Sequence, residues 1–333
     1  MKKLLAVMLS VVMAFSFAAC AGKSANNEGE SQTEETTTIR IGAMAGPTAM
    51  GMVKLRKDSE DGNTKNTYAF EDFATDASAF VTPLASGEID IAAVPSNLAA
   101  NIYNKTEGKV QVVAVNTLGV LNLVERGNSV NNISDLKGKT LYATGMGAVP
   151  EYTIRYILSA NGLDADKDVD IVWCSDTTEA LSKLKAQDGA IAVLPQPFVT
   201  AASAQISDLR VVMDLNDAWD KVNSTSKIVT GVIVVRKEFA DKYPEQLKQF
   251  IEEYKASVEY TSTNVDETAQ LIADYGVVAS ATIAKKALPR CHTVCYTNND
   301  MKDALKGFLK VLYDQNPKSV GGSMPEDDFY YEY

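Results

Sequence analysis

One short segment gathers residue types that bind metals or form covalent bonds. The segment RCHTVC holds Cys291, His292 and Cys295. Two cysteines this close can form a disulfide in an oxidising compartment, whereas a zinc site would need a fourth ligand and a more familiar spacing. We therefore expect no metal, and the sequence leaves a Cys291–Cys295 disulfide and free thiols open.

The rest of the chain offers little catalytic chemistry. His292 is the only histidine, and it lies outside the loops in which we expect a cleft. No nucleophile stands at a readable spacing from a general base. The sequence therefore favours binding without a cofactor over catalysis.

Candidate ligand-binding residues follow several expected strands. In open α/β sheets, ligands bind beyond the carboxyl ends of strands, where helix N-termini point. Gly46 allows close approach of the backbone, Pro47 suits a first helical turn, and Ser96 suits a helix N-cap. The candidates are Met44, Gly46, Pro47, Thr48, Asp76, Ser96, Asn97, Thr144, Gly145, Met146 and Gln196.

The chemistry of these loops leaves two ligand types open. The loops contain no Lys, Arg or His, and Asp76 is their one acid. Backbone N–H groups at helix starts can still hold an anion, and methionines suit a flat apolar or heteroaromatic ring. Gly, Pro and Ser are also ordinary turn residues, so no single loop decides the site.

Alternating strands and helices must position these loops. We expect strands over 38–44, 68–75, 89–94 and 110–117, with helices over 48–57 and 77–86 and from 97 between them. This rhythm predicts a mostly parallel sheet covered on both faces. In ASGEIDIAAV, Ser86 and Gly87 end a helix before a buried strand, and Gly138 of SDLKGKT suits a left-handed turn.

A second series of elements follows, and the chain then returns to the first. We expect a turn and a strand over 134–145 and strands over 169–174, 190–194 and 209–215, with helices over 150–161 and 178–186. A strand over 229–235 brings the chain back, and we expect only helices beyond it. The prediction is two α/β lobes, 38–122 with 228–333 and 123–227, joined by two crossing strands.

The first residues indicate export. Lys2 and Lys3 precede an apolar run and the small residues before Cys20, which is typical of a signal peptide over 1–19. F-A-A-C resembles the lipobox of bacterial lipoproteins, which implies a lipid on Cys20. Residues 20–37 are polar and acidic, so we expect a disordered tether.

Composition excludes one partner class. The chain is 46% hydrophobic and 23% charged, which fits a globular protein. The formal charge of −11, without a basic run, disfavours nucleic acid. We expect a monomer that meets the membrane through its lipid alone.

Three segments resemble a known family. IRIGAMAGPTAMGMVKL, TPLASGEIDIAAVPSN and ISDLKGKTLYATG resemble the nitrate, taurine, sulfonate and thiamine-precursor group of periplasmic-type binding proteins. The resemblance implies a type II periplasmic-binding-protein-like fold. It also implies a lipoprotein outside the cell membrane that captures a small organic molecule or anion for an ABC permease and its ATPase. An exported enzyme or a sensor on the same fold is the alternative.

Overall fold

The computed structural model describes residues 37–333. The predicted signal peptide, Cys20 and residues 20–36 of the predicted tether lie outside the described residues. No helix in the described part of the chain combines the length and apolar character needed to cross a bilayer.

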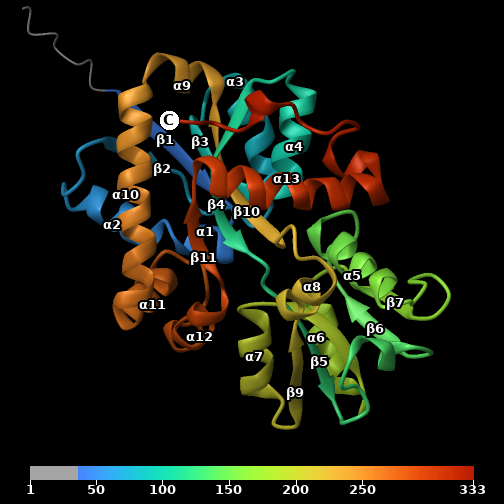
Figure 1. Ribbon diagram of the computed structural model, residues 1–333. Coiled ribbons are helices and arrows are strands. Elements are labelled where there is room, and N and C mark those ends of the chain that lie inside the picture. The colour runs from blue at the N-terminus through green and yellow to red at the C-terminus, as the bar shows by residue number, and fades with distance from the viewer. Residues whose placement is uncertain (1–36) are drawn as a thin grey trace, which may run out of the picture. The chain divides into compact units, whose positions relative to one another are not determined.

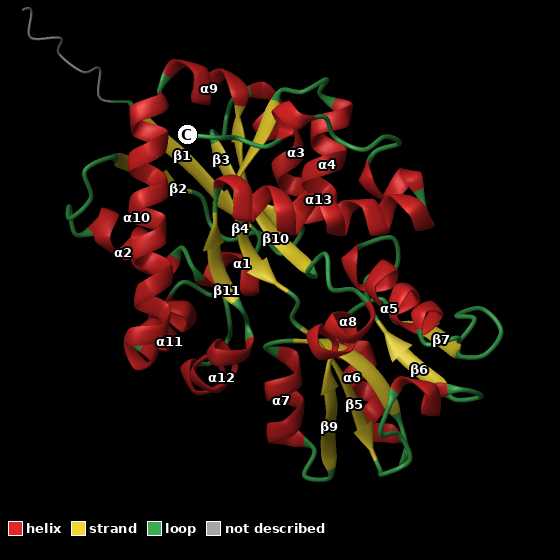
Figure 2. Cartoon of the chain, in the orientation of Figure 1, coloured by secondary structure: helices red, strands yellow, loops and turns green. Residues whose placement is uncertain are grey.

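Two β-sheets organise the described residues, and each is flanked by helices (Figures 1 and 2). The strands of the first sheet, in spatial order, are β11 (Thr293–Tyr296), β4 (Val110–Leu118), β10 (Val229–Arg236), β3 (Ile91–Pro95), β1 (Thr38–Ala43) and β2 (Thr67–Phe70). Those of the second sheet are β7 (Asp170–Trp173), β6 (Thr140–Ala143), β8 (Ile191–Pro195), β5 (Leu121–Arg126) and β9 (Leu209–Asp214). We call each sheet with its helices the first lobe and the second lobe.

The helices follow the strands in the chain. Those of the first lobe are α1 (Pro47–Met50), α2 (Val53–Glu60), α3 (Val81–Ser86), α4 (Ser96–Lys105), α9 (Lys237–Lys242), α10 (Pro244–Thr263), α11 (Val265–Asp274), α12 (Ala281–Ala287) and α13 (Asn298–Gln315). Those of the second lobe are α5 (Val149–Ala160), α6 (Thr177–Ala186), α7 (Phe198–Gln205) and α8 (Leu215–Val222). Short 3₁₀ turns cover Ala77–Phe80, Ile133–Leu136, Leu288–Arg290, Pro317–Val320 and Asp327–Phe329.

The chain crosses between the two sheets twice. Residues 119–120, the outgoing crossing, join β4 to β5, and residues 223–228, the return crossing, join α8 to β10. Leu118 pairs with Val229, so the outgoing crossing leaves the first sheet at the place where the return crossing enters it. A rotation of one lobe relative to the other must therefore change the backbone conformation of these two segments.

The first sheet is mixed, which corrects the expectation of a mostly parallel sheet. Strands β1, β2 and β3 are parallel, but β10 lies antiparallel between β3 and β4. The reason lies in the return crossing. Strands β3 and β4 end beside the crossings, whereas β10 begins there, so β10 must run in the opposite direction.

Several predicted elements need correction. The helix expected over 48–57 is two helices, α1 and α2, and the strand expected over 68–75 is only β2. The chain beyond 235 is not helical throughout, because β11 pairs with β4 with an irregular register. This strand has no clear alternation of its own. The expected turns are confirmed at Gly87 and Gly138, whose φ values are +81° and +74°.

The C-terminal residues pair with the first half of β4, on the side where β11 pairs only with the second half. Tyr330 forms a bridge with Val112, and the Tyr331 N–H donates to the Val112 carbonyl at 2.9 Å. Phe329 is fully buried and packs edge-on against Tyr103. The tail therefore covers backbone groups that an exposed strand edge would leave unpaired.

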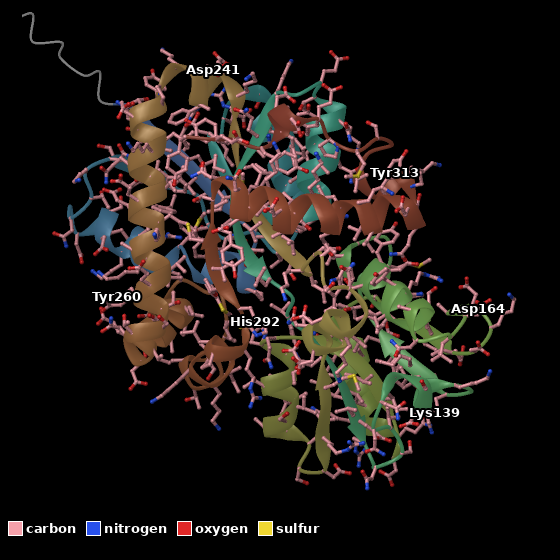
Figure 3. The ribbon with its side chains drawn as sticks, in the orientation of Figure 1. Lys139, Asp164, Asp241, Tyr260, His292 and Tyr313 are labelled. Carbon is pink, nitrogen blue, oxygen red and sulfur yellow. The ribbon has the colours of Figure 1, made fainter. Side chains whose placement is uncertain are left out.

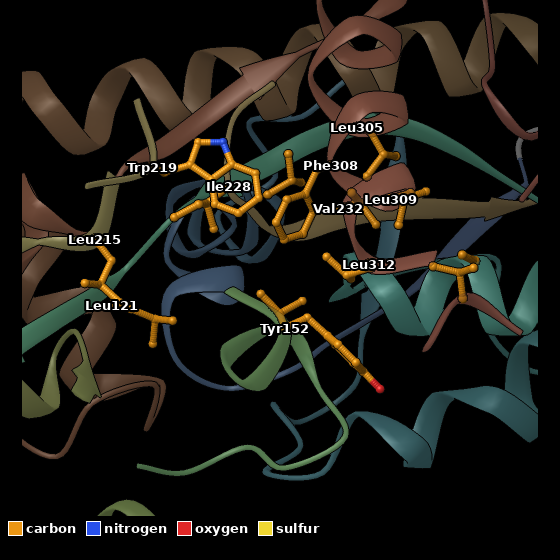
Figure 4. Packing of buried hydrophobic residues seen from close by; sticks show 14 of the residues in the cluster. Leu121, Tyr152, Leu215, Trp219, Ile228, Val232, Leu305, Phe308, Leu309 and Leu312 are labelled. Carbon is orange, nitrogen blue, oxygen red and sulfur yellow. The ribbon is translucent and has the colours of Figure 1, made fainter. Parts of the chain in front are cut away.

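One apolar core continues from the first lobe into the second. Trp219 on α8 is fully buried, and its ring lies 5.5 Å from that of Phe308 on α13. Figure 4 shows this contact together with Tyr152 and Leu312. The lobes are thus joined by packed side chains as well as by the two crossings.

Candidate functional site

Both sheets turn the carboxyl ends of their parallel strands toward the crossings. At the end of β3, Pro95 pairs with Gly231 of the return strand. At the end of β8, Pro195 pairs with Leu121, where the outgoing strand enters the second sheet. The loops after these strands therefore face the space between the lobes, where a hinged protein binds its ligand.

The start of α4 lies against the return strand. The Ser96 hydroxyl donates to the Val229 carbonyl at 2.6 Å. The residue at the N-cap position is Pro95, so the expectation that Ser96 caps this helix is wrong. Asn97 is 8% exposed, and no described residue forms a hydrogen bond with its side-chain amide. Asn97 is therefore a buried polar group with free hydrogen-bonding capacity at a helix start.

The start of α7 lies against the outgoing crossing. The Gln196 N–H donates to the Val120 carbonyl at 2.8 Å. The Gln196 side-chain oxygen accepts from the Thr200 hydroxyl at 2.8 Å, and Nε2 is buried without a described partner. Gln196 was predicted as a ligand contact, but the helix that follows it, α7, was not predicted.

The helices that follow strands of the second sheet differ in charge at their starts. Asp176 caps α6, and Asp214 caps α8. At α5, the Glu151 carboxylate accepts from the Gly147 N–H at 2.6 Å and from Arg155 Nε at 2.8 Å. Helix α7 has no side-chain cap, and neither does α4 in the first lobe. These two starts therefore keep the partial positive charge of their helices available.

The loop after β1 leads into α1 at Pro47, as the sequence predicts. Pro47 occupies the first turn of α1, and Gly46 has a φ of +103° with open space at the position of a Cβ. The Thr48 hydroxyl donates to the Met44 carbonyl at 2.7 Å. The Thr48 carbonyl accepts from Asn116 Nδ2 at 2.9 Å, so Asn116, which the sequence analysis missed, fixes this loop to β4.

Asp76 is an exposed cap beside that loop. Its carboxylate accepts from the backbone N–H and the hydroxyl of Ser78, both at 2.8 Å. The backbone bond first, and then the hydroxyl bond, lower the pKa of Asp76 below its ordinary value. The neighbouring Ala45 N–H donates to the Ala74 carbonyl, which holds the two loops together. Asp76 is thus an ionised residue that organises its own turn.

The loop after β6 holds Thr144, Gly145 and Met146. Thr144 is half-buried, and Met146 is 70% exposed. Gly145 has a φ of +81°, and a Cβ there would lie 2.8 Å from Pro150 Cγ. A side chain at Gly145 would therefore disturb the loop itself, so a substitution there does not report on ligand contact alone.

His292 lies at the outgoing crossing, although the sequence analysis placed it outside the cleft loops (Figure 3). Its Nδ1 lies 2.6 Å from the Gly119 carbonyl, which also accepts from Asn216 Nδ2 at 2.8 Å. The Leu118 N–H donates to the His292 carbonyl at 3.1 Å. His292 from the first lobe and Asn216 from the second therefore hold the same peptide of the hinge.

Cys291 and Cys295 are free thiols, so the disulfide that the sequence left open is not formed. Burial raises the pKa of Cys291 to about 12 and that of Cys295 to about 11. Both thiols are therefore protonated at neutral pH and are poor nucleophiles. Among residues 37–333, no cluster of His, Cys, Asp and Glu has the arrangement of a metal site.

Comparison with known proteins gives the family. Residues 71–287 match the model of a family described as the ABC transporter, phosphonate, periplasmic substrate-binding protein. The chain belongs to this family. This phosphonate-family member is therefore the substrate-binding component of an ABC transporter. It works outside the cytoplasm, with a ligand and a permease as its partners.

Solved structures confirm the predicted periplasmic-binding-protein-like fold. An ABC transporter protein from Parabacteroides distasonis is 25% identical, with a TM-score of 0.73 over 89% of this chain and 99% of that one. The aliphatic sulphonate-binding protein SsuA from Escherichia coli is 16% identical, with a TM-score of 0.71 over 89% and 92% of the two chains. The alkanesulfonate-binding SsuA from Xanthomonas axonopodis pv. citri, bound to MOPS, is 12% identical, with a TM-score of 0.61 over 87% and 94%. No curated protein matches this phosphonate-family chain.

Proposed function

We propose that the protein captures a small organic acid between its lobes and delivers it to the ABC permease. The observation that carries this proposal is the pair of uncapped helix starts, α4 and α7, beside the two crossings. Each start also has a carboxamide with free hydrogen-bonding capacity, that of Asn97 in the first lobe and that of Gln196, with its buried Nε2, in the second. A ligand between them would contact both lobes at the hinge.

An acid fits these groups better than a cation does. The first-turn N–H groups of a helix and the amide N–H groups of Asn and Gln are donors, and a helix N-terminus favours negative charge. Burial strengthens such interactions, because water does not compete with them. The absence of Lys and Arg from the predicted loops is therefore compatible with binding an anion.

The relatives support the same ligand class. The matched family is described by phosphonate, and the two SsuA proteins are described as binding aliphatic sulphonates or alkanesulfonates. Phosphonates and sulfonates both carry a tetrahedral oxyanion on carbon. We therefore propose a phosphonate or sulfonate in this site, in preference to the neutral heteroaromatic ligands that the sequence left open.

We further propose that Cys20 carries a lipid after removal of residues 1–19 and that residues 20–37 form the tether. The proposed lobes comprise 38–122 with 228–333 and 123–227. The candidate ligand contacts remain those given by the sequence analysis. To them we add the first-turn N–H groups of α7. The protein acts as a monomeric receptor and not as an enzyme or sensor.

Substitution of Asn97 with aspartate tests the ligand's charge. The two side chains have the same shape, but a carboxylate beside the ligand would repel an anion by about 4 kcal/mol at an effective dielectric constant of 20. We expect methylphosphonate and methanesulfonate to bind at least roughly 100-fold more weakly, as measured by isothermal titration calorimetry. Gln196→Glu should act in the same way from the second lobe, because its carboxylate still accepts from Thr200.

The matched control is Gln270→Glu, the same change on the exposed face of α11. Its affinity should equal that of the wild type. Thermal unfolding without ligand should show that Asn97→Asp and Gln196→Glu fold, since helix starts stabilise carboxylates. If both variants bind both acids with wild-type affinity, the proposed site is refuted. Binding of only a neutral aminopyrimidine, indifferent to both changes, would refute the ligand class.

Substitution of Cys20 with alanine tests the lipid anchor. Without the thiol there is no attachment point for diacylglycerol, so the protein should leave the membrane fraction and lose labelling by palmitate. Cys174→Ala is the control, because that thiol is buried in the second lobe. Palmitate labelling that persists in Cys20→Ala would show that the anchor has been assigned to the wrong residue.

A further inference from the structure

The chain's single histidine, His292, lies on the outgoing crossing (Figure 3). Its Nδ1 lies 2.6 Å from the Gly119 carbonyl oxygen. A carbonyl oxygen only accepts hydrogen bonds, so Nδ1 must carry a proton. Asn216 Nδ2 donates to the same oxygen and lies 3.2 Å from Nδ1, as two donors that share one acceptor do. In the neutral imidazole, Nε2 is therefore the nitrogen without a proton.

An acid of the second lobe lies beside this nitrogen. Asp214 ends β9 and caps α8, and its Oδ2 lies 4.0 Å from His292 Nε2. The other carboxylate oxygen accepts from the backbone N–H and from Nδ2 of Asn216, both at 2.8 Å. These two bonds hold the carboxylate in place. A second proton on His292 would therefore put a positive charge beside a fixed negative one, across the boundary between the lobes.

Asp214 is the one charged partner of this imidazole. Among residues 37–333, no other carboxylate oxygen lies within 4.0 Å of its nitrogens. The elements around His292 carry further charges, since α8 follows Asp214 and α10 packs against β11. These charged side chains are Arg290 in the loop of His292, Asp217 and Lys221 on α8, and Lys255 and Glu259 on α10, which act on Cys295. A change of charge on His292 therefore acts most strongly on Asp214.

The backbone of the crossing is built around this contact. A Cβ at Gly119 would overlap Asn216, so a side chain there would displace the carboxamide. His292 itself has a φ of +45°, in the left-handed region. The next carbonyl of the crossing, that of Val120, accepts from the Gln196 N–H at 2.8 Å. The segment that His292 holds is therefore also bonded to a proposed ligand contact.

We infer that His292 and Asp214 form a proton-dependent latch between the lobes. Imidazole side chains change charge between pH 5 and 8, whereas carboxylates are mostly ionised there. In mild acid the latch favours the arrangement of the lobes seen in this structure, and it is lost as the pH rises. The latch goes beyond the proposed function. Its effect on ligand capture rests on that function, because a ligand that contacts both lobes binds more tightly when they are held together.

A double-mutant cycle between His292→Asn and Asp214→Asn tests the latch without ligand. Asparagine at 292 keeps an N–H donor near the position of Nδ1 and tolerates a left-handed φ, but it lacks Nε2. Asparagine at 214 keeps an oxygen that can cap α8. In urea unfolding at pH 5.5, the coupling between the two changes should alter the unfolding equilibrium constant by roughly two- to fivefold. At pH 8 the coupling should vanish.

The matched control is Asp217→Asn, the same change at an exposed acid in the first turn of α8. It should show no coupling to His292→Asn at either pH. Absence of coupling between His292→Asn and Asp214→Asn at pH 5.5 overturns the latch. Coupling of equal size at pH 5.5 and pH 8 also overturns it, because the contact would then not depend on a proton.

Titration with methanesulfonate tests the effect on capture, because a sulfonate keeps its charge across this range. Wild-type affinity should rise roughly two- to fivefold from pH 8 to pH 5.5. His292→Asn and Asp214→Asn should lose this rise, and Asp217→Asn should keep it. A rise that persists in His292→Asn, or no rise in the wild type, overturns the effect on capture. Absence of binding at both pH values counts against the proposed function, while the unfolding cycle still decides the latch.

Discussion

Replacing Trp219 with alanine is expected to lower the free energy of unfolding by about 4 kcal/mol. The side chain is fully buried where the lobes meet, with ring centroids of Tyr156 and Phe308 at 4.5 and 5.5 Å. Its Nε1 donates to the Ser226 carbonyl at 3.0 Å. Alanine would leave a cavity and a buried carbonyl without its donor, and both effects destabilise the folded state.

Urea unfolding at neutral pH measures this loss, with Trp173→Ala as the control. Trp173 lies on edge strand β7 and is only partly buried, so its removal should cost clearly less. Trp219→Phe should lie between the two, because it keeps an aromatic ring but not the N–H donor. An equal loss in Trp219→Ala and Trp173→Ala would show that the contact between α8 and α13 is not a main source of stability.

Replacing Asp90 with alanine is expected to cost about 3 kcal/mol, at the lower end of the range for a broken buried ion pair. The Asp90 side chain is 2% exposed and accepts from Arg40 at 2.7 Å and from Arg236 at 2.9 Å. Removing the carboxylate would leave two guanidinium groups close together. Arg40 is 40% exposed and can turn to water, but Arg236 is 16% exposed and would remain partly buried.

The same carboxylate predicts a dependence of stability on pH. Burial opposes its ionisation, but hydrogen bonds from the Arg40 side chain and backbone and from Arg236 outweigh burial, so the pKa of Asp90 lies below its ordinary value of 3.8. A carboxylate with a lowered pKa stabilises the folded state above the unfolded pKa. That contribution disappears as the pH falls through the folded pKa.

Unfolding free energies at neutral pH and at successively lower pH below 3.8 test both statements. At neutral pH, Asp90→Ala should show the expected loss of stability. The difference between wild type and Asp90→Asn should be largest at that pH and should shrink with acid. The control is Asp166→Ala, which breaks the pair with Arg155 at a 74% exposed carboxylate and should cost less than about 1 kcal/mol. A difference for Asp90→Asn that stays constant across the acid range would contradict this account.

Part of the candidate site could be read from local residue patterns. Gly46 with Pro47 and Asn97 after a buried strand mark points where a strand gives way to a helix, and the structure has helices there. These transitions from strand to helix are encoded by neighbouring residues. The charge at each helix start is harder to predict from the sequence, because it depends on which side chain folds back onto the first turn. Glu151 occupies the start of α5 by accepting from Gly147, whereas no side chain does so at α4.

The sequence by itself determined the elements with a strong local signal: the continuous apolar runs of β3 and β10, the amphipathic α10, and the turns at Gly87 and Gly138. Periodicity and left-handed glycines act within a few residues. The tertiary structure alone decided the antiparallel insertion of β10, the pairing of β11 and the place of His292. Ser96 bonds a carbonyl 133 residues away, and His292 one 173 residues away. Contacts at such separations form only after distant parts of the chain pack together, because their partners have no local pattern in common.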